Sequence, residues 1–223
     1  AAETAGVVTQ VGFMFRFGVA IQRLKRLIDS GEAGPVGLMS ARYFCNSLHA
    51  GWWRDRAKSG GQLVEQVIHM IDLMRFLMGE AATVYSVQRN RFHQQMPDYT
   101  VEDVSGTVIS FVNGAIGVLY ATNGAIPGRW INDYRVVTQN ITAEFTDANH
   151  AAFFYTATPE ARTEQIAGTK DYYCNEMLDL HAAITDGRPA ATPIREGARS
   201  LDVALAATRS AQTGAVVNLL SHL

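Results

Sequence analysis

The chain has 223 residues, of which 48% are hydrophobic and 18% are charged, and its formal net charge is −2. A nearly neutral chain lacks the basic surface that nucleic acids and anionic membranes attract, so we expect neither partner. The small share of charged residues leaves apolar surface uncovered, which indicates a second buried face at an oligomer or domain interface.

The cysteines and the N-terminal residues give no sign of export. Only Cys45 and Cys174 occur, without the spacing of a metal or redox motif, which is typical of a reduced cytoplasmic protein. The opening AAETAGVVTQ lacks the basic and apolar parts of a secretory signal. No stretch reaches the roughly 18 to 20 apolar residues of a membrane span. We therefore expect a soluble, cytoplasmic protein.

The first third of the chain contains two helical patterns separated by a strand and a loop. The pattern predicts a strand over residues 7–17, an amphipathic helix over 19–30, a second strand over 38–47, a tryptophan-rich loop over 50–59, and a long apolar helix over 60–79. After Gly79 the hydrophobic period changes from that of a helix to that of a strand.

The remainder is predicted as strands followed by two helices. Strands are expected over 83–92, 104–111 and 115–123, and shorter ones over 134–138, 141–146 and 152–156. The pair Asn113-Gly114 indicates a tight turn. The polar connection over 89–103 is interpreted as a hairpin tip or substrate lid. Helices are expected over 171–185 and 194–213.

This order favours an α+β fold in a single domain over residues 1–223. Adjacent strands flanked by helices predict an open, mainly antiparallel sheet with helices packed on one face. The opposite face then needs a cover, and we expect it to form a homodimer or homotetramer.

The helix over 60–79 carries polar residues within an apolar run. Glu65, His69 and Asp72 fall on one side of the helix, at i,i+4 and i,i+3 spacing. Three interpretations are open: a solvated helix face, a metal site of carboxylate and imidazole ligands, or an acid–base pair in which a carboxylate supports a histidine. A second histidine at helical spacing is missing, so we expect no metal. The other five histidines are interpreted as surface or packing residues.

The surroundings of this helix carry a family resemblance. The stretch WWRDRAKSGGQLVEQVIHMIDLMRFLMGE resembles a signature of the glucose–fructose oxidoreductase and inositol dehydrogenase (Gfo/Idh/MocA) family. Its tryptophan, glycine pair, acid-x-x-x-His-x-x-Asp helix and closing glycine correspond to Trp53, Gly60, Gly61, Glu65, His69, Asp72 and Gly79. The segments VTQVGFMFRFGVAIQRLKRLIDSGEAGPVG and NEMLDLHAAITDGRPAATPIREGARSLDVALAATRSAQTGAVVNL are also similar to the family, so the resemblance covers nearly the whole chain.

The resemblance implies NAD(P)-dependent oxidation or reduction of a sugar, a polyol or a related hydroxyl compound. It implies that His69 is the catalytic proton acceptor or donor and that Glu65, where the family more often has aspartate, is its partner. Arg16, Trp53, Arg54 and Asp72 are candidate substrate-binding residues. Each also has a structural interpretation: a strand-end arginine, a packed tryptophan, a loop arginine and a carboxylate bonded to nearby backbone.

The dinucleotide-binding part of the family is not recognisable in this sequence. No G-x-G-x-x-G motif follows a strand, and Gly31, Gly34 and Gly37 have the spacing of a turn. The Glu-Lys-Pro motif of the family is also absent. We therefore expect a C-terminal domain whose NAD or NADP binds in a missing Rossmann domain, with no cofactor bound to this chain alone. The competing interpretation is a binding or assembly domain without catalysis.

Overall fold

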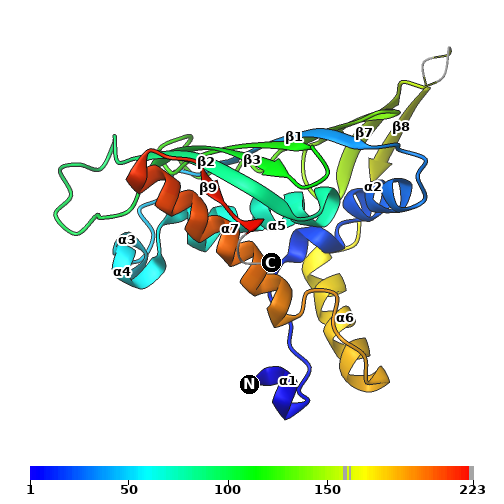
Figure 1. The fold of residues 1–223 in the computed structure, drawn as a ribbon, viewed down its shortest axis with the longest axis horizontal. Helices are drawn as coiled ribbons and strands as arrows, with labels where there is room; N and C mark the ends of the chain where they lie inside the picture. The colour runs from blue at the N-terminus through cyan, green and yellow to red at the C-terminus, as the bar shows by residue number, and fades with distance from the viewer. Residues whose placement is uncertain (158–159, 161, 221–223) are drawn as a thin grey trace.

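The computed structural model describes residues 1–157, 160 and 162–220 and consists of one large sheet with helices on one side (Figure 1). Within these residues the sheet has nine strands in the order β8-β7-β6-β5-β1-β4-β3-β2-β9. The strands are β1 (Val36–Phe44), β2 (Ala81–Arg89), β3 (Val104–Phe111), β4 (Ile116–Thr122), β5 (Tyr134–Thr138), β6 (Ile141–Phe145), β7 (His150–Tyr155), β8 (Arg162–Ala167) and β9 (Val217–Asn218). Only β1 and β4 pair in parallel among the described strands. The predicted α+β fold with a mainly antiparallel open sheet is confirmed.

The helices lie below the sheet in Figure 1, and α6 projects away from it. They are α1 (Ala2–Ala5), the 3-10 turn η1 (Met14–Phe17), α2 (Val19–Asp29), α3 (Gly51–Arg54), α4 (Arg56–Ser59), the π-helical turn η2 (Leu63–Val67), α5 (Ile68–Met78), α6 (Tyr172–Asp186) and α7 (Ile194–Thr213). No helix in the described ranges is long and apolar enough to cross a membrane.

Side-chain alternation along the strands separates the core from the open face of the sheet. In β3, Ile109 and Phe111 are buried against the helices, whereas Val108 points the other way and is 43% exposed. The same period of two leaves apolar side chains along the open face, because successive residues of a strand point to opposite sides. These open-face residues are Leu38, Tyr85, Val87, Val108, Ile116, Tyr120, Val137 and Phe154.

The strand predicted over residues 7–17 is wrong. Its backbone joins no strand: the Val11 N–H donates to the Thr192 carbonyl, and Met14–Phe17 tightens into η1. The alternation of apolar residues instead serves packing, since Phe13 and Phe15 are both buried. The predicted helix that follows is confirmed as α2, and Gly31 has a φ of 82° just after its end.

The tryptophan-rich segment is helical where a loop was predicted. It forms two single-turn helices, α3 and α4, and the Asp55 side chain caps α4 by accepting from the Ala57 N–H. Two strands were not predicted: β8 is a polar edge strand, and β9 is only two residues long. The two C-terminal helices were predicted to within one residue, because both carry long helical periods.

Candidate active site

The helix that carries the polar residues begins with a glycine pair and a π-helical turn. Gly60 and Gly61 have φ values of 81° and 104°, which favour glycine. A Cβ on Gly61 would lie 2.5 Å from the Glu102 Oε2 atom, so this position also needs the absence of a side chain. The Glu102 carboxylate accepts from the Leu63 N–H at 2.7 Å and from Arg56 at 2.7 Å. Turns of this π-helical kind are frequent at functional sites.

Glu65 lies in the π-helical turn and is bonded to a tryptophan. The Trp53 Nε1–H donates to Glu65 Oε2 at 2.6 Å. Trp53 is 2% exposed, and the His49 ring covers it at a centroid distance of 4.3 Å. The structure therefore joins two of the predicted site residues, the aromatic Trp53 and the acid Glu65, through the indole N–H.

His69 lies one turn further, at the start of α5, and is partly buried against two aromatic rings. The edges of Phe13 and Phe15 approach it with centroid distances of 6.1 and 5.7 Å. Its Nδ1 atom is buried and has no hydrogen-bond partner among the described residues. Burial lowers the pKa of His69 to about 4, so the imidazole is neutral near pH 7 and able to accept a proton.

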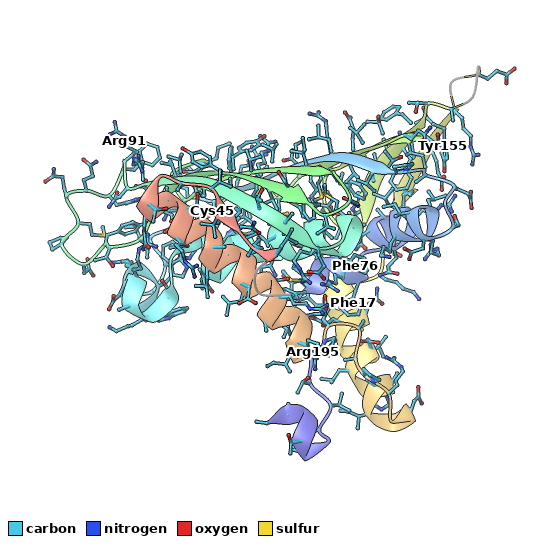
Figure 2. All side chains as sticks on the ribbon, in the orientation of Figure 1. Phe17, Cys45, Phe76, Arg91, Tyr155 and Arg195 are labelled. Atoms are coloured by element: carbon cyan, nitrogen blue, oxygen red, sulfur yellow. The ribbon has the colours of Figure 1, made fainter. Side chains whose placement is uncertain are left out.

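Arg16 and Asp72 meet in the interior. Arg16 binds the Asp72 carboxylate through two hydrogen bonds of 2.6 Å each, and Ser200 donates to the same carboxylate at 2.9 Å. The Arg16 guanidinium also lies 4.9 Å from the centre of the Phe76 ring, on the helix side of the sheet where Figure 2 shows Phe76. Asp72 is 1% exposed, so the interpretation of Glu65, His69 and Asp72 as a solvated helix face is wrong at Asp72.

Arg54 supports the loop that precedes α3. Its Nε donates to the Leu48 carbonyl at 2.7 Å, and its Nη2 donates to the His49 carbonyl at 3.0 Å. His49 has a φ of 49°, the only positive value at a non-glycine residue in the described part of the chain. Such backbone conformations gather at functional sites.

Three residues with aromatic rings in this region, Tyr43, His49 and Trp130, were not predicted as site residues. Trp130 is 53% exposed and meets the rings of Tyr43 and His49 edge-on at 6.0 and 5.7 Å. Burial raises the pKa of Tyr43, and the charges of Cys45, Glu65 and Tyr173 add to that increase. Only the alternation along β1 could have placed Tyr43 on the helix side, and no local pattern marks the other two.

A metal centre finds no support in this geometry. Within the residues that the structure describes, no group of three or more His, Cys, Asp or Glu side chains is arranged to hold a metal ion. The ridge residues Glu65, His69 and Asp72 have separate surroundings, with Trp53, two phenylalanines and Arg16 respectively.

Several curated relatives of the chain are inositol dehydrogenases. It is 28% identical over 238 residues to scyllo-inositol 2-dehydrogenase (NAD(+)) of Bacillus subtilis (strain 168), an alignment that covers 97% of this chain and 64% of that protein. It is 31% identical over 120 residues to inositol 2-dehydrogenase 4 of Saccharopolyspora erythraea, covering 49% of this chain and 34% of the relative. The chain thus spans about two thirds of the length of the first relative.

Solved structures with the same fold include two sugar oxidoreductases. Levoglucosan dehydrogenase in complex with NADH and levoglucosan superposes with a TM-score of 0.88 at 19% identity, covering 96% of this chain and 67% of that one. Aldose-aldose oxidoreductase from Caulobacter crescentus superposes with a TM-score of 0.83 at 22% identity, covering 97% and 65%. The family model "GFO/IDH/MocA C-terminal domain" matches residues 21–144, more than half of the chain. The protein therefore belongs to the GFO/IDH/MocA family and corresponds to its C-terminal domain.

Proposed function

We propose that residues 1–223 are the substrate-binding and oligomerisation domain of an NAD(P)-dependent oxidoreductase that acts on a sugar, a polyol or a related hydroxyl compound. The observation that carries this proposal is the placement of a neutral, partly buried His69 one helical turn after Glu65, within a chain of this family. The relatives that are inositol dehydrogenases support the substrate class.

The chemistry assigned to this chain is proton transfer at a substrate hydroxyl. Oxidation of an alcohol to a carbonyl requires a group that accepts the hydroxyl proton, and a neutral imidazole does so. His69 is kept neutral by burial, and its ring orientation is fixed by Phe13 and Phe15. The Glu65 carboxylate is the nearby group that stabilises the imidazolium formed.

We propose that the substrate packs against a surface formed by aromatic side chains and by the hydroxyl of Tyr43. Trp130 is the exposed aromatic side chain beside Tyr43 and His49, and aromatic faces suit the C–H faces of a sugar ring. Trp53 and Arg54 shape this wall from behind, because the Trp53 ring is covered and Arg54 is bonded to backbone carbonyls. The Arg16–Asp72 pair holds η1, and with it Phe15, against α5.

The glycine turn over residues 31–37 does not have the arrangement of a dinucleotide cradle. A Rossmann cradle has a glycine-rich turn between a strand and the following helix. Here Gly31 and Gly34 lie between α2 and β1 and Gly37 lies in the first residues of β1, so a strand follows the glycines and the order is reversed. The side chain of Gln139 lies 2.9 Å from where a Gly34 Cβ would be and fills this turn. We propose that NAD or NADP binds in a separate Rossmann domain and that no cofactor binds this chain alone.

The assembly that we propose uses the open face of the sheet. Its exposed apolar row suits a homodimer or homotetramer, since a twofold interface needs one self-complementary surface. A cytoplasmic location remains a prediction from the cysteines, which are both free.

The test of the catalytic assignment uses the chain joined to a dinucleotide-binding domain. We expect NAD(P)-linked oxidation of an inositol or aldose, and a loss of about 100-fold or more in turnover for His69→Ala. His181→Ala is the control, because His181 is exposed on α6. Unchanged turnover in His69→Ala would favour the binding or assembly domain without catalysis. Stoichiometric zinc, iron or manganese in the purified protein would revive the metal site.

A further inference from the structure

Glu65 and His69 are four residues apart, but their side chains have different surroundings. The Glu65 carboxylate accepts from Trp53 Nε1 at 2.6 Å, a short charge-assisted bond. His69 Nδ1 is buried without a partner among the described residues. A carboxylate and an imidazole at this spacing on a regular helix lie close enough to interact. The structure therefore contains an acid and a base that are neighbours but are not bonded.

Two features allow Glu65 to reach the tryptophan. The π-helical turn Leu63–Val67 changes the direction of side chains relative to a regular helix. The Trp53 indole is fixed in place, since His49 covers it and Tyr99 and Val101 pack in the same buried cluster. The donor is thus rigid, and the flexible partner is the glutamate.

The negative charge of Glu65 affects residues near Trp53 and not His69. After burial, Glu65 contributes to raising the pKa of Tyr43 and of Cys45. For His69 burial is the only cause of the lowered pKa, and the rings facing it, Phe13 and Phe15, are uncharged. The hydrogen bond to Trp53 thus directs the Glu65 carboxylate toward the indole, and the two rings that contact His69 carry no charge.

We propose that Trp53 is a positioning residue whose indole N–H holds Glu65 away from His69, and that the two form a pair only when this hydrogen bond is released. The inference rests on the proposed function, because it names how the acid and base of that site are kept apart. Release lets the carboxylate approach Nδ1 and stabilise the imidazolium that forms when His69 takes a hydroxyl proton.

The test is a pH titration of His69 by NMR in the chain itself. We expect Trp53→Phe, which removes the N–H donor and shortens the buried ring, to raise the His69 pKa by about one unit or more in the folded variant, since a carboxylate then approaches the imidazole. The matched control is Trp52→Phe, because Trp52 is the neighbouring residue and is 51% exposed. Adding Glu65→Gln to Trp53→Phe is expected to cancel the increase. An unchanged His69 pKa in folded Trp53→Phe overturns the proposal.

A second variant tests the same idea without disturbing the buried tryptophan. In Glu65→Ala we expect the His69 pKa to stay within about 0.3 units of the parent, because the carboxylate does not act on His69 while Trp53 holds it. The Trp53 indole N–H resonance is expected to move in this variant and not in Glu32→Ala. A fall of the His69 pKa by half a unit or more would show that the pair already exists. These outcomes are independent of turnover in the joined protein, which tests the proposed function.

Discussion

Arg16 and Asp72 are 56 residues apart in sequence and meet through two parallel hydrogen bonds, Nε to Oδ2 and Nη2 to Oδ1, each 2.6 Å long. Arg16 lies in η1 and Asp72 in α5, while Ser200 joins the carboxylate from α7. The pair thereby fixes three segments beneath the candidate active site. Both side chains are almost fully buried, which makes the loss of either one costly.

We expect Asp72→Ala to lower the free energy of unfolding by about 3 to 5 kcal/mol, because it leaves the Arg16 guanidinium buried without its main partner. The measurement is urea denaturation followed by circular dichroism. Asp29→Ala is the matched control, since Asp29 pairs with Lys25 and is 58% exposed, and exposed pairs contribute about 1 kcal/mol or less. Equal losses in the two variants would contradict the structural role of the Arg16–Asp72 pair.

The periodicity of the sequence was enough to predict most elements. α7 and β5 were predicted with their observed bounds, because long helical and alternating patterns depend only on which face is buried. The strand predicted over residues 7–17 failed because alternation also occurs in an irregular segment that buries Phe13 and Phe15 against His69. The segment pairs with no described strand: Val11 bonds Thr192, which is far away in sequence, and Met14–Phe17 forms a 3-10 turn.

The side-chain contacts around Glu65 and His69 could be predicted only in part, because they too depend on residues far away in sequence. The motif located Glu65 and His69 on adjacent turns, but helical spacing cannot show that Trp53 rather than His69 bonds the carboxylate. The π-helical turn has no signal in the apolar pattern. Asp72 lies on the same side as His69, yet its partner comes from η1, far away in sequence. Local patterns identify the residues of such a site, whereas their partners depend on the tertiary packing.

The glycine pair before the π-helical turn provides a second prediction. We expect Gly61→Ala to destabilise the chain by about 3 kcal/mol or more, because it combines a φ of 104° with a Cβ placed 2.5 Å from Glu102 Oε2. Gly114→Ala is the control: Gly114 has a φ of 88° but nothing within 4 Å of its Cβ position. We expect thermal unfolding to show the larger loss for Gly61→Ala. A loss no greater than that of Gly114→Ala would show that the Glu102 contact can relax freely.

The buried carboxyl group of Glu176 should make the stability of the chain depend on pH. It is 4% exposed, its Oε1 has no partner among the described residues, and burial raises its pKa to about 7. In the unfolded chain a glutamate has a pKa of about 4.3. Between these values the folded state keeps a proton that the unfolded state has released, so the free energy of unfolding falls as the pH rises from about 4.3 to 7.

Glu176→Gln is expected to remove this fall, because the glutamine amide does not ionise. The variant should match the parent near pH 4 and exceed its stability at pH 8 by about 3 to 4 kcal/mol. Denaturant titrations at the two pH values measure the difference. The control is Glu32→Gln, which changes an exposed carboxylate and should leave the pH dependence of the parent unaltered. A gain of the same size at both pH values would mean that ionisation of Glu176 is not the cause.

If the chain associates through the open face of the sheet, a charged residue introduced on that face should dissociate the oligomer. Tyr120 lies on β4 in the exposed apolar row and is 44% exposed, so Tyr120→Lys would bury a charge in any interface formed there. We expect sedimentation velocity to show dimers or tetramers of the parent and monomers of this variant. Ile184→Lys is the matched control, because Ile184 is 62% exposed but lies on α6, on the helix side. An oligomer that survives Tyr120→Lys and dissociates in Ile184→Lys would move the interface to the helices.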